Sequence, residues 1–97
     1  MPLSKEAMRE KIVCIEWDDA TFNSGFYDKK TPENFEPTFT QTVGHLVRKT
    51  AKYIIVSQDR FYDSKGKPSD DRHLSIIPKK MIRRVILLNK EEVDATT

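Results

Sequence analysis

The stretch Leu74-Ser-Ile-Ile-Pro-Lys-Lys-Met-Ile-Arg-Arg-Val-Ile-Leu-Leu88 decides the fold. It begins as an apolar strand, passes through one basic turn, and ends as a second apolar strand from Ile82 to Leu88. Because proline fixes φ and lacks an N–H, Pro78 should end the first strand and begin a single 3₁₀-like turn. Two strands joined in this way are typical of small, strongly bent five-stranded barrels. We therefore expect a mainly β fold.

Three further strands are predicted upstream of this segment, at about residues 12–17, 42–47 and 53–57. In the first of them Val13, Ile15 and Trp17 alternate with polar or small residues and should share one face. Gly44 lies inside the second predicted strand, where glycine marks sharp bending or a close approach of two backbones. The five predicted strands make one small barrel domain over residues 1–97.

The segments outside these strands have different predicted roles. A short N-terminal α-helix is expected over about residues 4–11, because Ser4 can cap its first N–H groups and Leu3 is spaced to pack on Met8. Residues 20–42 form a long insertion rich in turn signals, and residues 63–71 a polar loop that should protrude and be mobile. The polar tail, residues 91–97, is expected to fray.

Composition limits the classes of protein that this chain can belong to. The 97 residues carry a net charge of +2, which is not the composition of a strongly basic nucleic-acid binder. The charge is uneven, since residues 1–42 hold five Lys/Arg against eight Asp/Glu and residues 43–97 hold twelve against seven. Cys14 is the single cysteine, which excludes an intrachain disulfide. With no signal peptide and no apolar membrane-spanning run, we expect a soluble cytoplasmic protein.

No catalytic signature accompanies the strands. His45 alternates with valines and is expected to be an ordinary strand residue, and His73 follows a charged loop without a closed set of metal ligands. Asp18 and Asp19 are adjacent, so on a strand they would point apart rather than act as a carboxylate pair. We expect no enzyme, no metal and no cofactor.

Basic residues cluster at two predicted loops. Arg48, Lys49 and Lys52 surround the turn before Tyr53, and Lys79, Lys80, Arg83 and Arg84 surround the closing turn. In a small barrel these loops can lie on the same rim, where the cations would bind phosphates and Tyr53 would stack on a base. The candidate nucleic-acid-binding residues are Lys49, Lys52, Tyr53, Lys79 and Lys80. The alternative is that these charges serve solubility and protect edge strands.

The insertion over residues 20–42 is unusually aromatic. Two interpretations stay open: the rings cover one end of the barrel, or they form a contact with a ligand or a protein partner. The aromatic residues concerned are Phe22, Phe26, Tyr27, Phe35 and Phe39.

The order of elements and the closing segment resemble the Sm-like family, over about residues 4–89. The segments that carry the resemblance are Trp17-Asp-Asp, Thr42-Val-Gly-His-Leu-Val-Arg-Lys, Tyr53-Ile-Ile-Val-Ser-Gln and Ile77-Pro-Lys-Lys. They are similar in particular to small uncharacterised phage proteins, some described as Sm-like proteins of cyanophage type. The family's RNA-contacting motifs are not matched over residues 49–53 and 78–79.

The resemblance implies a homo-oligomeric ring in which the fourth strand of one subunit pairs with the fifth strand of the next. Such pairing would also satisfy edge strands that are otherwise open to uncontrolled association. The candidate interface residues are Leu74, Ile76, Ile77, Val85, Ile86, Leu87 and Leu88. The resemblance thus implies a non-enzymatic, ring-forming protein of phage-like origin, and the basic rim suggests that it binds RNA or other nucleic acid. The alternative is a phage structural or protein-interaction module that uses its aromatic insertion and has no nucleic-acid role.

Overall fold

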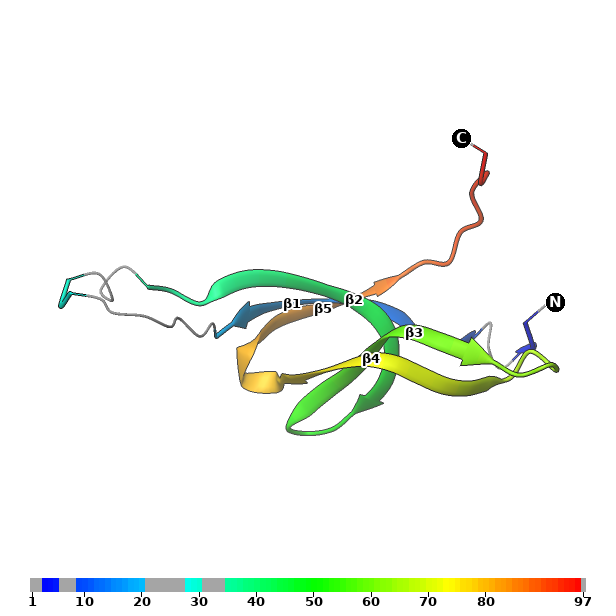
Figure 1. Ribbon diagram of the computed structural model, residues 1–97, viewed down its shortest axis with the longest axis horizontal. Coiled ribbons are helices and arrows are strands. Elements are labelled where there is room, and N and C mark those ends of the chain that lie inside the picture. The colour runs from blue at the N-terminus through cyan, green and yellow to red at the C-terminus, as the bar shows by residue number, and fades with distance from the viewer. Residues whose placement is uncertain (1–2, 6–8, 21–27, 31–34, 97) are drawn as a thin grey trace.

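The computed structural model describes residues 3–5, 9–20, 28–30 and 35–96. Within these residues the chain forms one five-stranded antiparallel sheet in the order β4-β3-β2-β1-β5 (Figure 1). The elements are β1 (Ile12–Asp19), β2 (Thr38–Lys49), β3 (Tyr53–Tyr62), β4 (Pro68–Pro78), the 3₁₀ turn η2 (Lys79–Met81) and β5 (Ile82–Leu88). The predicted mainly β fold and its strand, one-turn 3₁₀, strand segment around Pro78 are confirmed.

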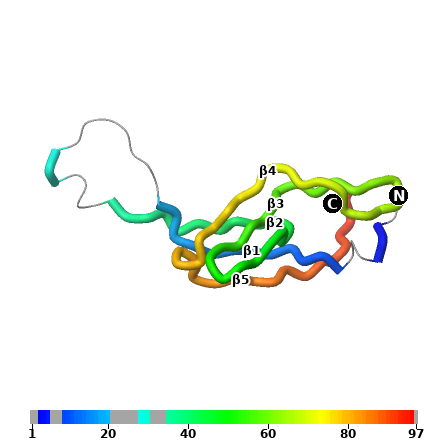
Figure 2. The backbone as a smooth tube through the Cα atoms, turned by 90° about the horizontal axis from the view of Figure 1, so that it is seen from below, coloured from blue at the N-terminus to red at the C-terminus, as the bar shows by residue number. Residues whose placement is uncertain are grey.

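The sheet is bent at the middle of β2. The first part of β2 pairs with β1 as far as His45, whereas its last part, from His45 to Lys49, pairs with β3. Gly44 lies at this bend, and a Cβ atom built on it would sit 2.5 Å from the carbonyl oxygen of Ser57. The predicted close approach of two backbones at this glycine is confirmed. Figure 2 shows the β3–β4 half rising away from β1 and β5.

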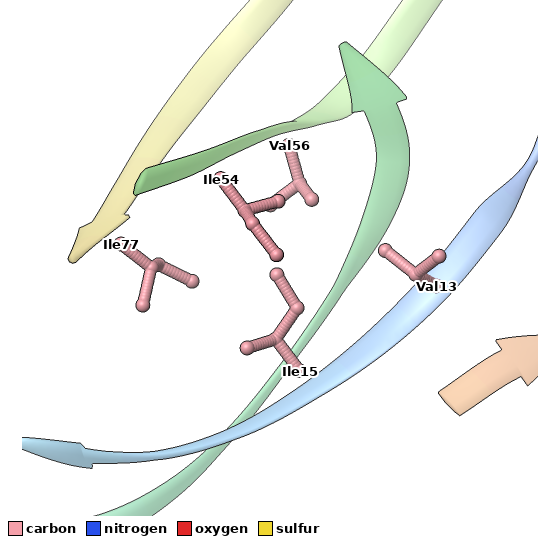
Figure 3. Close-up of a cluster of buried hydrophobic side chains, with 5 residues drawn as sticks. All are labelled: Val13, Ile15, Ile54, Val56 and Ile77. Carbon is pink, nitrogen blue, oxygen red and sulfur yellow. The ribbon is translucent and has the colours of Figure 1, made fainter. Parts of the chain in front are cut away.

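The hydrophobic core fills the inside of this bend (Figure 3). Its buried members come from β1, β3 and β4, and are Val13, Ile15, Ile54, Val56 and Ile77. Trp17, Leu46 and Ile82 are partly buried against them. The indole Nε1 of Trp17 donates a hydrogen bond of 2.9 Å to Oγ1 of Thr42, which satisfies its polar atom. The alternation predicted for β1 is therefore the pattern that builds the core.

The expectation of a closed barrel is wrong. Strands β4 and β5 are the two edges of the sheet and do not pair with each other. The reason lies in the closing segment: β4 pairs with β3 up to Pro78, while β5 pairs with β1. The single turn of η2 therefore carries the chain from one edge of the bent sheet to the other.

Other boundaries also differ from the predictions. The N-terminal helix over about 4–11 is not supported, and residues 6–8 lie outside the described residues. The polar loop shrinks to residues 63–67, because residues 68–71 belong to β4 and pair with the end of β3. Strand β1 continues through Asp18 and Asp19, which pair with the first residues of β2. Pairing with a long neighbouring strand thus overrides the local turn signals. Among the described residues, no helix is long and apolar enough to cross a membrane.

Candidate nucleic-acid interface

The two predicted basic loops meet at one end of the sheet. The backbone N–H of Lys79 donates a hydrogen bond of 2.9 Å to the carbonyl oxygen of Lys52. The ladder between β3 and β4 places Tyr53 directly opposite Pro78. All five candidate residues therefore lie on or beside the β2–β3 hairpin turn and η2, next to each other in Figure 1. We call Lys49, Lys52, Tyr53, Lys79 and Lys80 the lysine rim.

The hairpin turn in the lysine rim is fixed by one threonine. The Oγ1 atom of Thr50 accepts hydrogen bonds of 3.1 Å from the backbone N–H groups of Lys52 and Tyr53. The N–H of Thr50 in turn donates to the carbonyl oxygen of Tyr53 at 2.9 Å. A threonine hydroxyl that bonds the backbone two and three residues ahead holds a tight turn in one conformation. The rim is therefore a preorganised surface.

The side chains of the lysine rim face solvent. Lys49, Lys52 and Lys80 are exposed, and Tyr53 and Lys79 are half-buried. In the part of the chain that the structure describes, none of these four lysines forms an ion pair with a carboxylate. Their positive charge is thus available to an anionic ligand.

The two arginines of the closing turn have partners of their own. Arg84 donates to the buried carboxylate of Glu16, which also accepts a hydrogen bond of 2.8 Å from the Gln41 side chain. These bonds lower the pKa of Glu16 from its ordinary value. Arg83 pairs with Asp18 at 2.8 Å. Sequence reasoning grouped these arginines with the rim lysines, but their charges are largely compensated.

A second polar cluster was missed by sequence reasoning. The Arg60 side chain, only 7% exposed, bonds Glu10 at 2.5 Å and Asp71 at 2.7 Å. The hydroxyl of the fully buried Ser57 donates to the same Asp71 carboxylate at 2.7 Å. The Arg60 hydrogen bond, helped by Ser57, lowers the pKa of Asp71. The signal that could have found this cluster is the charged run at 70–72, which was assigned to a loop rather than to a strand facing β3.

His45 lies beside this cluster. Its Nδ1 atom is buried and has no hydrogen-bond partner among the described residues. Burial, together with the nearby Arg60 guanidinium, lowers the pKa of the His45 imidazole. The Ser57 hydroxyl donates to Asp71 and not to this histidine, so these side chains are not arranged as a nucleophile and its base.

The predicted interface residues divide between the core and the surface. On β4, Leu74 and Ile76 are 54% and 63% exposed, whereas Ile77 is buried in the core. On β5, Val85 and Leu87 are 43% and 60% exposed. Ile86 and Leu88 are half-buried. Both edge strands therefore combine an unpaired backbone edge with exposed apolar side chains.

Within the aromatic insertion, the structure describes residues 20, 28–30 and 35–42. Phe22, Phe26 and Tyr27 lie outside the described residues. Phe35 and Phe39 are 44% and 50% exposed. A protein partner for these rings stays a prediction.

Comparisons of the chain with protein-family models, with curated proteins and with solved structures give no match.

Proposed function

We propose that this chain is an Sm-like β module that assembles with copies of itself and binds single-stranded RNA through the lysine rim. The observation that carries the proposal is the hydrogen bond between Lys79 and Lys52, because it holds two cationic loops together at one end of the sheet. Lysines grouped in this way neutralise phosphates, and binding is then driven by the release of counterions. Tyr53, half-buried between the loops, supplies a ring on which a base can stack.

Assembly is supported by the chemistry of the two edges. Cross-strand partners share a face, so Val85 and Leu87, which pair with Ile15 and Val13, lie on the core face. They line an open pocket of about 240 Å³ at the β5 side of the core. If β4 of a second copy pairs with β5, the core-facing side of that β4 strand lies next to them.

This pairing is head-to-tail, because β4 and β5 are different strands. A heterologous contact of this kind gives a ring when its rotation closes. Pairing between copies would also bury apolar side chains that are exposed to water in the single chain, because the core is too small to cover them. Edge strands that present exposed apolar residues rarely remain unpaired.

RNA binding is tested with a fluorescent 12-nucleotide oligouridylate in a salt series. We expect the affinity to fall as salt rises, and the double variant Lys52→Gln/Lys79→Gln to bind more weakly with a shallower salt dependence. The matched control is Lys65→Gln/Lys67→Gln, which removes two exposed lysines from the far β3–β4 turn. Absence of binding at low salt, or an equal loss in the control, contradicts the RNA proposal.

Assembly is tested separately by sedimentation. We expect a species larger than the 11.3 kDa chain at micromolar concentration. Ile76→Lys and Leu87→Lys each place a charge on one edge and should shift the protein toward monomer. Arg72→Gln, an exposed change on β4 away from its apolar end, should not. A wild-type protein that sediments only as a monomer rules out the assembly proposal and leaves RNA binding to be judged alone.

A further inference from the structure

An arginine and a phenylalanine form a fixed stack next to the lysine rim. The guanidinium carbon of Arg83 lies 4.9 Å from the centre of the Phe39 ring. The same guanidinium donates to both carboxylate oxygens of Asp18, at 2.8 and 3.1 Å. Since two parallel bonds fix the plane of an arginine, Asp18 holds the guanidinium over the ring.

The ring of this stack is available to a ligand. Phe39 is 50% exposed, although the Arg83 guanidinium lies over its ring. Arg83 covers one face, and the exposed part of the ring remains in contact with water. Because Asp18 compensates the charge of Arg83, what the stack presents is an exposed π surface held in a fixed orientation.

The position of the stack continues the lysine rim. Phe39 pairs with Asp18 across the β1–β2 ladder, and Arg83 follows Lys80 by three residues. The turn η2, which carries Lys79 and Lys80, contacts β1. Figures 1 and 2 both place η2 beside the end of β1 and the start of β2. A nucleic-acid strand lying across Lys79 and Lys80 would thus continue toward the start of β2, where Phe39 lies.

A second stack of phenylalanine, arginine and aspartate lies elsewhere in the described part of the fold. Arg72 lies 5.2 Å from the centre of the Phe61 ring and pairs with Asp59 at 2.9 Å. This stack is on the β3–β4 arm, where Phe61 pairs with Asp70 and the following turn holds Asp63 together with Lys65 and Lys67. Phe61 is near the end of β3 that is opposite to Tyr53, so of the two stacks the Phe39 stack is the one beside the lysine rim.

We propose that the Phe39–Arg83 stack is a base-binding platform for single-stranded nucleic acid, in which a base stacks on the Phe39 ring while the neighbouring phosphates lie on Lys79 and Lys80. The proposal rests on the proposed function of the lysine rim. Base stacking on an aromatic side chain contributes substantially to the affinity of single-strand binders and tolerates any sequence. The platform would extend the footprint of the strand from Tyr53 to the start of β2.

The experiment separates stacking from phosphate binding by using two probes of equal length and charge. One is the oligouridylate, and the other is an abasic oligonucleotide of the same length. For Phe39→Ala we expect affinity for the oligouridylate to fall about tenfold, with affinity for the abasic strand unchanged. Phe39→Leu keeps an apolar side chain without a π face and should behave as Phe39→Ala, whereas Phe39→Tyr should retain wild-type affinity. Phe61→Ala is the matched control and should change neither.

Each outcome decides the matter. If Phe39→Leu binds both probes as the wild type does, the platform is overturned while the lysine rim stands. If Phe39→Leu loses affinity for both probes equally, Phe39 maintains the structure of the lysine rim and does not stack on a base. The platform is then also overturned. If neither probe binds the wild-type protein, the proposal that the lysine rim binds RNA is wrong, and the platform that rests on it is also ruled out. Far-ultraviolet circular dichroism of each variant establishes that it is folded.

Discussion

Replacing Gly44 by alanine should measure how tightly the bend holds β2 against β3. The added Cβ would lie 2.5 Å from the Ser57 carbonyl oxygen and 3.3 Å from the Val56 Cβ, whereas ordinary contacts begin at 3.4 Å. One strand must therefore move by roughly 0.9 Å. Neither neighbour can yield easily, because Val56 is in the core and Ser57 is fully buried.

Overpacking of this kind costs about 1–3 kcal/mol, and the lower entropy of the unfolded alanine chain offsets less than about 1 kcal/mol of it. We expect a net loss of about 2 kcal/mol in the free energy of unfolding, which lowers the melting temperature by roughly 8–16 °C.

The measurement is urea unfolding followed by Trp17 fluorescence at one fixed protein concentration. Val43→Ala is the control, since that neighbouring side chain is 52% exposed and should cost less than about 1 kcal/mol. A Gly44→Ala protein within about 0.5 kcal/mol of the wild type would refute the close approach as the reason for glycine at this position.

Two further predictions concern the interior. Ile54→Ala should lower the free energy of unfolding by about 3 kcal/mol in the same assay, because it opens a cavity in the core. Ile76→Ala changes a side chain that is 63% exposed and should cost far less in the monomer. Equal losses in the two variants would contradict the assigned core. His45 has a pKa below its ordinary value of 6.5, so the unfolded chain binds the proton more readily and the free energy of unfolding should fall as pH drops from 7.5 to 5.5. Asp71 also loses its contribution on acidification, as the pH falls through its ordinary pKa of 3.8 toward its lowered folded-state pKa. His45→Gln should flatten this slope. An unchanged slope in His45→Gln argues against this histidine as the titrating group.

Strand positions could be predicted from the sequence where one face is buried. The alternation of Val13 and Ile15 and the proline at residue 78 identified strands that the structure contains. Their extents could not be predicted in the same way, because Asp18, Asp19 and residues 68–71 read as breakers and become strand only through pairing with a neighbour. Local chemistry favours turns there, and ladder hydrogen bonds and ion pairs outweigh it.

The candidate site shows the same limit. Sequence spacing indicated that two basic loops could share a rim, and the backbone bond between Lys52 and Lys79 joins them. Spacing could not show that Arg83 and Arg84 are held by Asp18 and Glu16, since these partners come from the opposite end of the chain. The Arg60 cluster was hidden for a different reason, because Asp71 was assigned to a loop and not to a strand beside β3. Pairing between distant segments decides which charges remain for a ligand.

The pairing of β1 with β5 has a consequence for how the protein is made. Ile12 pairs with Leu88, so one edge of β1 stays without hydrogen-bond partners until β5 is available to pair with it. The β2–β3 and β3–β4 hairpins are local and can form while the chain is still leaving the ribosome. Until β5 emerges, the apolar residues of β1 are covered on one side only. The apolar residues of β1 are therefore most exposed to misassociation in the interval before β5 has emerged.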